Sequence, residues 1–201
     1  MTMRVGIYLF DKAEVLDFAG PFEVFSTAAR VWRNSKPDAE RLFDVFTLSS
    51  EGQTVAARAG LRVVPDHSLN NHPPIDLLLI PGGIVSYELE KPEVIDWIRR
   101  QAGQSQITAS VCTGAMLLAK AGLLDGLTAT THWEDIAELQ QAFPGVQVLS
   151  DQRWVDHGHI ITSAGISAGI DMSLHLVARL AGQDIAAQTA RQMEFDWTER
   201  P

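Results

Sequence analysis

Short apolar segments alternate with segments of helical periodicity along the chain, and this alternation constrains the fold more than any other feature. Strand-like runs occupy residues 3–10, 43–49, 76–80, 106–111, 146–150, 153–157 and 159–164, and helix-like segments occupy 20–32, 91–102, 113–121, 131–143 and 167–182, with a last helix reaching about Met193. A strand followed by a helix, repeated, requires crossover connections and therefore a parallel sheet. The run 76–80, DLLLI, has no polar alternation, which is typical of a strand covered on both faces. The sequence therefore predicts an α/β fold with a mostly parallel central sheet and helices on both faces.

Several local signals refine these boundaries. Pro21 suits the first turn of the helix at 20–32, and residues 54–65 have the pattern of a short hairpin in which Leu61 and Val63 alternate. Thr131 and Glu134 match the Thr-x-x-Glu capping pattern at the start of the helix at 131–143. In that helix an apolar stripe is expected from Trp133, Ile136, Leu139 and Phe143. Ser167 is the expected cap of the following helix.

Composition and charge exclude several classes of function. The 201 residues, 46% of them hydrophobic, suit one domain spanning residues 1–201. The formal net charge of -9 argues against binding nucleic acid by the chain itself or binding an anionic membrane. The N-terminal apolar run is short and reads as a strand, not a signal peptide. One cysteine cannot form an internal disulfide, so we expect a cytoplasmic location.

The single cysteine, Cys112, falls where the strand-like run at 106–111 meets a run of helix formers. Ser110 and Gly114 lie two positions on either side, and a sharp turn that carries a nucleophile between strand and helix needs small neighbours. The start of a helix places partial positive charge beside the sulfur and favours the thiolate. The pattern therefore predicts a reactive thiol. The alternative is a buried cysteine that acts as a small hydrophobe.

Proteins with open parallel sheets bind their ligands beyond the carboxyl ends of the strands, so the loops at that end form the candidate site. One such loop carries Gly82 and Gly83, whose backbone can approach a ligand closely. The amides of Gly83 and Thr113 would then give two donors for developing negative charge. A plain tight turn is the alternative.

Asp17 lies among Val15, Leu16, Phe18 and Ala19, directly before the expected helix. A carboxyl group in apolar surroundings has a raised pKa and can donate a proton. The alternative is an ordinary carboxylate at a helix start. Glu23, inside the helix, and Asp11, in a polar turn, are weaker candidates.

The histidines are not expected to hold a metal. His157 and His159 have the spacing of a ligand pair, but Gly158 between them indicates a hairpin turn and no third ligand clusters nearby. His132 is expected to be structural, His67 and His72 to lie in a loop, and His175 to be half-buried on a helix. We expect neither a metal nor an organic cofactor.

Four motifs, VLDFAGPFEV (15–24), IPGG (80–83), SVCTGAMLLAKAGLLDGLTATTHW (110–133) and SAGISAGID (163–171), occur in this order. With them the chain resembles the DJ-1/PfpI superfamily and, within it, the isocyanide hydratases. The resemblance covers nearly the whole chain and implies a flavodoxin-like three-layer sandwich and a homodimer that acts on a small molecule. It assigns the nucleophile to Cys112, the general acid to Asp17 and the oxyanion amides to Gly83 and Thr113, with Ile166 and Gly82 lining the pocket. It implies hydration of an isocyanide to an N-substituted formamide through a covalent thioimidate.

Other readings of the resemblance remain open. PfpI-like proteases carry histidine directly after the cysteine, where this chain has Thr113, so a Cys-His dyad for peptide hydrolysis is missing. DJ-1-like members use an early glutamate where Asp17 stands here. The sensor domains of AraC-type transcription regulators share the motifs SVCTGA, AGLLDG and ATTHW. A non-catalytic sensor or redox module is therefore one alternative, and a glyoxalase-like hydratase of small dicarbonyls is another.

Overall fold

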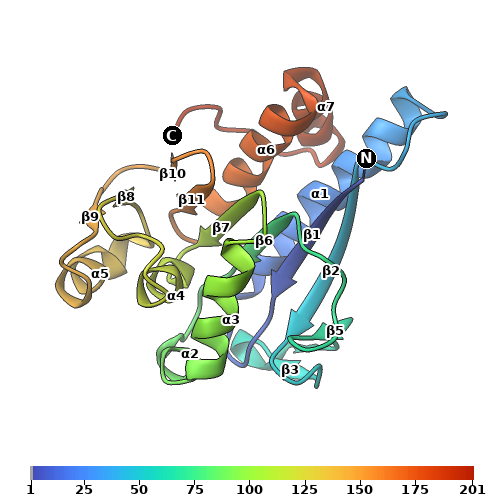
Figure 1. Cartoon of the computed structure of the whole chain (residues 1–201). Helices are drawn as coiled ribbons and strands as arrows, with labels where there is room; N and C mark the ends of the chain where they lie inside the picture. The colour runs from blue at the N-terminus through green and yellow to red at the C-terminus, as the bar shows by residue number, and fades with distance from the viewer. Residues whose placement is uncertain (1) are drawn as a thin grey trace.

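A seven-stranded sheet organises the computed structural model, which describes residues 2–201 (Figure 1). The strand order is β10-β11-β7-β6-β1-β2-β5, and neighbours run parallel except for β10, which is antiparallel to β11. Its strands are β1 (Met3–Tyr8), β2 (Phe43–Ser49), β5 (His67–Ser68), β6 (Leu77–Ile80), β7 (Ile107–Val111), β10 (Trp154–Asp156) and β11 (Ile160–Ser163). Two small sheets pair β3 (Val55–Ala56) with β4 (Arg62–Val63) and β8 (Thr128–Ala129) with β9 (Gln147–Val148).

Helices cover both faces of the large sheet. They are α1 (Val15–Ser35), α2 (Ser86–Leu89), α3 (Pro92–Ala102), α4 (Gly114–Lys120), α5 (Ile136–Ala142), α6 (Ala168–Ala181) and α7 (Gln183–Gln192), with one-turn helices η1 (Arg58–Gly60) and η2 (Trp133–Asp135). In Figure 1 α1, α6 and α7 pack together behind the sheet, α3 lies in front of it, and α5 stands beside β8 and β9. The predicted mostly parallel sheet with helices on both faces is confirmed, and so is the hairpin of β3 and β4.

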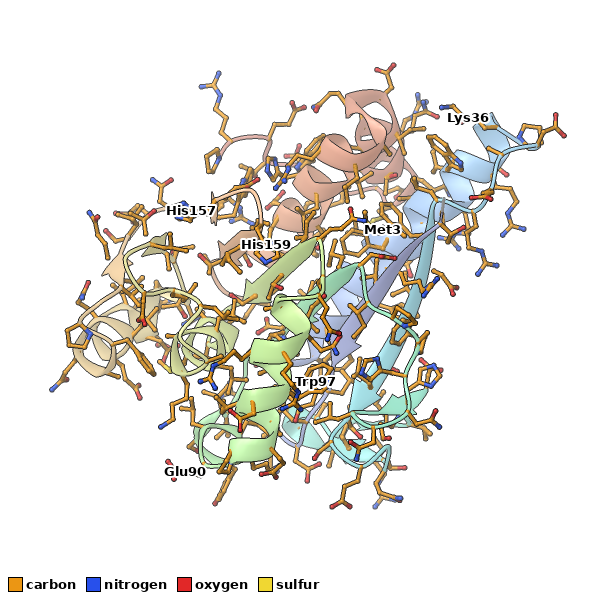
Figure 2. The ribbon with its side chains drawn as sticks, viewed as in Figure 1. Met3, Lys36, Glu90, Trp97, His157 and His159 are labelled. Carbon is orange, nitrogen blue, oxygen red and sulfur yellow. The ribbon has the colours of Figure 1, made fainter. Side chains whose placement is uncertain are left out.

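Burial follows the apolar patterns. All four residues of β6 have no exposed surface, as predicted for a strand covered on both faces. The stripe of α3, which comprises Val94, Ile95, Ile98 and Ala102, is buried as well. The indole of Trp97 on the same helix donates to Nε2 of His72 at 3.2 Å (labelled Trp97 in Figure 2). This bond anchors the loop before β6 to the front helix layer.

The first helix begins earlier than predicted. α1 starts at Val15, so Pro21 lies inside the helix and not in its first turn, and Asp17 is in the first turn and not before it. Proline has no backbone N–H, so the helix loses the bond that residue 21 would give to the carbonyl of residue 17. Residues 15–19 form one continuous helix with the rest of α1, and within them Asp17 and Phe18 are buried, so tertiary packing outweighs the turn signal of the proline. The shift fixes the carboxyl group of Asp17 on a rigid helix.

The predicted cap at Thr131 and Glu134 is wrong. The Thr131 hydroxyl donates to the carbonyl of Cys112 at 2.8 Å, and the amide of Glu134 donates to Nδ1 of His132. The side chain of Trp133 is 76% exposed, so it is not part of the buried stripe that was predicted. Ser167 occupies the residue before α6 but makes no side-chain capping bond. A tertiary partner for Thr131 thus overrides the local capping pattern.

The sheet order brings the candidate loops together. The chain goes from β1 to β2 on one side and from β6 to β7 and β11 on the other, so the order reverses between β1 and β6. In parallel sheets a crevice opens at such a reversal, beyond the carboxyl ends of the strands. At this carboxyl end of the sheet lie the segments 9–14, 81–85, 112–113 and 164–167. Among residues 2–201 no helix combines the length and the hydropathy needed to cross a bilayer.

Candidate active site

Cys112 occupies the sharp turn between β7 and α4 with a φ of 57°, a left-handed conformation that is strained for a residue with a side chain. Gly114, two residues on, is essential to this turn, because a Cβ there would lie 2.3 Å from the carbonyl oxygen of Ile80. The turn is held from outside as well: the Cys112 amide donates to the carbonyls of Ser163 at 3.1 Å and Ala164 at 3.3 Å. The thiol therefore has a fixed position at the carboxyl end of the central strand β7.

Asp17 faces this turn from α1 and is completely buried. Its Oδ2 accepts a hydrogen bond from the amide of Gly82 at 3.0 Å, whereas Oδ1 has no hydrogen-bond partner of good geometry. The thiol of Cys112 and the amide of Ile166 also approach this carboxyl group, and both lower the pKa of Asp17. Burial acts in the opposite direction and more strongly, and with the charge of Glu14 it raises the pKa of Asp17 to about 7. A carboxyl group with this pKa can hold a proton near neutral pH.

The environment of the thiol opposes the predicted acidity. Burial, and then the negative charge of Asp17, raise the pKa of Cys112 to about 12, against the lowering effect of the Thr113 amide and hydroxyl. The stabilisation of the thiolate that was expected from the helix start is thus smaller than the cost of burying its charge. The repulsion from Asp17 vanishes when that carboxyl group is protonated. The thiolate is therefore favoured most in the state in which the shared proton lies on Asp17.

The two predicted oxyanion amides have different environments. The Gly83 amide donates to Oγ1 of Thr113 at 2.8 Å, and this hydroxyl donates in turn to the carbonyl of Gly83 at 2.9 Å. The Gly83 amide is therefore already engaged, and a ligand must displace the hydroxyl to use it. The amide of Thr113 is directed at the sulfur of Cys112 and helps to lower its pKa. Of the two donors, Thr113 is the one positioned beside the reacting atom.

Backbone pairing locks the acid loop to the glycine loop. Ala13 and Gly83 form an antiparallel bridge, flanked by bonds from Glu14 N to Gly82 O at 2.9 Å and from Ile84 N to Lys12 O at 3.1 Å. Only glycine fits at position 83, because its φ is 134° and a Cβ would lie 2.3 Å from Lys12 O. The loops after β1 and β6 therefore form one rigid wall.

A cavity of about 250 Å³ opens over the thiol. Its lining comprises Glu14, Arg58, Gly83, Ile84, Cys112, Thr113, His132, Glu134, Asp135 and Ile166. Three carboxylates thus face it against one guanidinium, and that guanidinium is paired with Glu14 at 3.2 Å. Ile166 has a φ of 55° and is 38% exposed, so its side chain projects into the space.

His132 was missed as a site residue. It was predicted to be structural, yet its imidazole lines the cavity and Nδ1 lies 3.5 Å from Oδ2 of Asp135. The hydrogen bond from Thr131 to the carbonyl of Cys112 positions the neighbouring His132 at the cavity, and no local sequence pattern predicts that bond. Gly165 also gives it room, because a Cβ at that position would lie 2.1 Å from the imidazole. Arg58 and Glu14 were also unforeseen.

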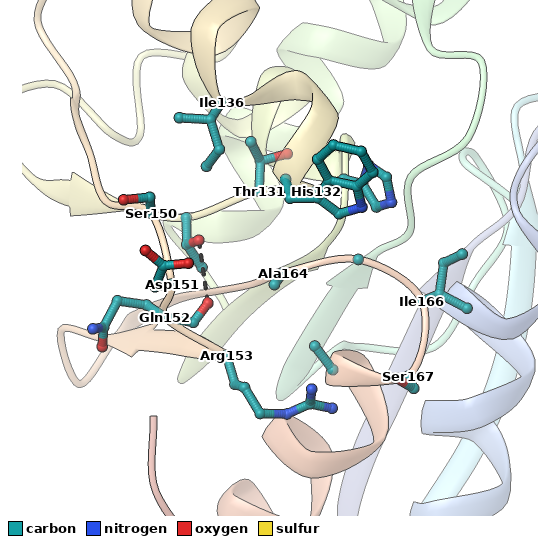
Figure 3. Close-up of a pocket in the computed structure, with 14 residues that line it drawn as sticks. Thr131, His132, Ile136, Ser150, Asp151, Gln152, Arg153, Ala164, Ile166 and Ser167 are labelled. Carbon is teal, nitrogen blue, oxygen red and sulfur yellow. Dashed lines mark hydrogen bonds between the residues drawn. The ribbon is translucent and has the colours of Figure 1, made fainter.

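A second, larger cavity of about 770 Å³ adjoins the first (Figure 3). It is lined by Thr130, Thr131, His132, Trp133, Ile136, Ser150, Asp151, Gln152, Arg153, Ala164, Gly165, Ile166, Ser167 and Ala168. His132 and Ile166 line both spaces and therefore form their common wall. In Figure 3 Ser150, Asp151 and Gln152 lie at the end of the cavity away from Ile166.

The other histidines lie apart from the thiol. His157 bonds Thr128, and both ring nitrogens of His159 contact carbonyl oxygens, of Gln106 and Ala102, near the β10–β11 edge (Figure 2). Within residues 2–201 no group of three or more His, Cys, Asp or Glu side chains could hold a metal ion. Of the weaker acid candidates, Asp11 accepts from the amide of Ala56, and Glu23 pairs with Arg30 on the surface of α1. Neither Asp11 nor Glu23 lines the cavity of the thiol.

Comparison with known proteins relates the chain to enzymes and to regulators. The chain is 34% identical to the isonitrile hydratase of Pseudomonas putida, over 97% of this chain and 79% of that protein. It is 31% identical to the HTH-type transcriptional regulator GbdR of Pseudomonas aeruginosa, over 96% of this chain, and spans only half the length of that regulator. Among solved structures, a THiJ/PfpI family protein from Pseudomonas syringae superimposes with a TM-score of 0.84 at 25% identity, over 98% of this chain and 77% of that chain. The model of the DJ-1/PfpI family matches residues 3–179, and the chain belongs to the DJ-1/PfpI family.

Proposed function

We propose that this protein is a cysteine-dependent isocyanide hydratase that converts an isocyanide and water into an N-substituted formamide. One observation carries the proposal: a completely buried carboxyl group, with an oxygen free of good hydrogen bonds, faces the thiol in the strained turn. An isocyanide needs a nucleophile and a proton at one carbon atom. Cys112 and Asp17 offer both at one place.

The reaction follows from this pairing. The Cys112 thiolate attacks the terminal carbon of R–N≡C, and Asp17 gives its proton to that carbon, which leaves a covalent thioimidate R–N=CH–S. Water then adds across the C=N bond, its hydroxyl going to carbon and its proton to nitrogen. The tetrahedral adduct expels the thiolate, the C=O bond forms, and the hydroxyl proton returns to Asp17. The net reaction adds one water, and Thr113 N–H stabilises charge beside the sulfur.

The test is direct. Purified protein is incubated with an aryl isocyanide, and formation of the formamide is followed by absorbance. We expect turnover that Cys112→Ala abolishes and that Asp17→Asn lowers by roughly 10²-fold or more, the usual scale for general acid catalysis. Undiminished turnover in the Asp17→Asn variant contradicts the assignment of the acid.

A ligand or redox sensor is the second candidate, because 96% of this chain resembles one half of the transcription regulator GbdR. In that case no isocyanide is hydrated, and Asp17→Asn changes only how fast peroxide oxidises Cys112. Phenylglyoxal, assayed in parallel, tests the hydration of dicarbonyls.

We also propose a homodimer in the cytoplasm. On the α1 helix Leu16 and Phe22 each remain 37% exposed, and burial of such apolar surface would stabilise the association of two copies. The single cysteine supports a reducing compartment.

A further inference from the structure

The space above the thiol is small, and it leaves little room for a bulky N-substituent beside the reacting carbon and the water that must follow. At about 250 Å³ it lies below the range of 300–1,000 Å³ that is typical of ligand pockets. The adjoining cavity is about three times as large. His132 and Ile166 belong to the lining of both, so a molecule that reaches the sulfur can extend past these two side chains without crossing the protein core.

The larger cavity offers an apolar contact for such an extension. Its apolar lining includes Trp133, Ile136 and Ile166, and the rings of Trp133 and His132 lie with their centroids 5.7 Å apart. Trp133 is 76% exposed, although a large aromatic side chain gains most free energy when it is covered. At the end of the cavity away from Ile166, the hydroxyl of Ser150 and the amide of Gln152 can form hydrogen bonds with a polar group of the substituent.

Charge restricts what can enter. Both arginines that line the two cavities are paired, Arg58 with Glu14 and Arg153 with Asp171. Glu134 and Asp135 add two carboxylates to the small cavity, and Asp151 adds one to the large cavity. A unit negative charge a few ångströms from such groups is repelled by an amount that corresponds to several-fold in rate for each carboxylate.

We propose that the larger cavity receives the N-substituent of the substrate, and that the substrate is an isocyanide without negative charge whose aryl or alkyl group reaches Trp133 past His132 and Ile166. This assignment rests on the proposed function for its reaction, but the cavity itself can be tested by binding alone.

Two matched substrates test the charge selection. Methyl 4-isocyanobenzoate and the 4-isocyanobenzoate anion differ by one charge at nearly equal length. We expect kcat/KM to be about tenfold or more higher for the ester. Asp151→Asn, which removes the carboxylate that lines the larger cavity, should narrow this ratio several-fold, whereas Glu90→Gln, exposed at the bottom of the view in Figure 2, should leave it unchanged. Equal rates for the two substrates would overturn the charge selection.

Substituent size tests the cavity. Trp133→Ala should raise KM for the aryl ester at least fivefold with little change in kcat, and leave methyl isocyanide unaffected. Tyr87→Ala is the control, since Tyr87 is also 75% exposed and lines neither cavity. A variant that handles both isocyanides like the wild type shows that the substituent lies elsewhere.

Binding separates the two proposals. The product of the ester, N-(4-methoxycarbonylphenyl)formamide, is unreactive, and its affinity is measured by calorimetry. Weaker binding by Trp133→Ala but not by Tyr87→Ala supports the cavity even where no isocyanide is turned over, in which case only the proposed reaction fails. Binding that Trp133→Ala leaves unchanged, or no binding at millimolar concentration, overturns the cavity assignment.

Discussion

The amide of Gly82 donates a hydrogen bond to Oδ2 of Asp17 at 3.0 Å, across 65 residues of sequence. This bond fixes one carboxyl oxygen and leaves the other, Oδ1, toward the turn that carries the thiol. Because the carboxyl and the thiol are both buried and repel each other when ionised, the pair readily loses one proton but resists losing the second. The first three predictions below follow from this pair.

Turnover should rise as the pH passes through about 7. The doubly protonated pair has no thiolate. Loss of one proton near the pKa of about 7 of Asp17 creates the singly ionised pair, in which transfer of the remaining proton from sulfur to the Asp17 carboxylate gives the reactive thiolate and neutral acid. A profile of kcat/KM between pH 5 and 9 measures this. A profile that is flat, or that falls through pH 7, contradicts the one-proton active state.

Asp17→Asn should make the thiol more acidic. The substitution removes the negative charge that helps to raise the pKa of Cys112, while an amide can keep a bond to Gly82. We expect the pH midpoint of alkylation by iodoacetamide to be lower in the variant than in the wild type, although turnover is lost. An unchanged or higher midpoint would mean that burial alone sets the pKa of the thiol.

Asp17→Asn should also change how stability depends on pH. The pKa of Asp17 is raised on folding from its usual value to about 7, so protonated Asp17 favours the folded state at low pH, and this contribution disappears as the pH rises through about 7. The whole effect is on the order of 4 kcal/mol. The melting temperature of the variant should therefore rise relative to the wild type between pH 5 and 8. A difference that stays constant over this range rules out the raised pKa.

Gly82→Ala should damage the site, whereas Gly103→Ala should not. A Cβ at position 82 would lie 2.5 Å from the amide nitrogen of Thr113 and 2.8 Å from Cβ of Cys112. Displacing the turn should cost about 1–3 kcal/mol in unfolding free energy and about 10²-fold in kcat/KM. At Gly103 the nearest atom is 3.5 Å away, so urea unfolding should give a change within about 0.5 kcal/mol. Wild-type rates for Gly82→Ala would show that the turn can move without harm.

Leu16→Lys should weaken the proposed dimer. A lysine on the exposed face of α1 places charge within the expected interface, and light scattering coupled to size exclusion should show a shift toward the monomer mass. Ile84→Lys, exposed to a similar degree, is the control. A wild-type protein that is monomeric at every concentration refutes the dimer.

Much of the fold was accessible from sequence because its signals are local and repeated. The unbroken apolar run of β6 and the buried stripe of α3 predict a sheet covered by helices, and both occur as expected. The small residues around Cys112 likewise indicate the sharp turn. In each case residues close in sequence determine the outcome.

The errors lie where distant partners decide. Thr131 matches a helix cap, but it bonds to Cys112, 19 residues away, and carries His132 to the cavity. The acidity of the thiol was judged from its place at a helix start, whereas its pKa depends on burial and on Asp17. No short window of sequence contains either relationship.

The bridge between Ala13 and Gly83 has a wider consequence. Backbone atoms alone join the loop that leads into Asp17 to the loop beside Cys112, so, once position 83 is glycine, their spacing does not depend on which side chains the other loop residues carry. A family built on this joint can replace the acid, the residue after the cysteine or the lining of the cavities and still inherit the same distances. Hydratase and regulator can thus diverge by exchanging side chains on an unchanged frame.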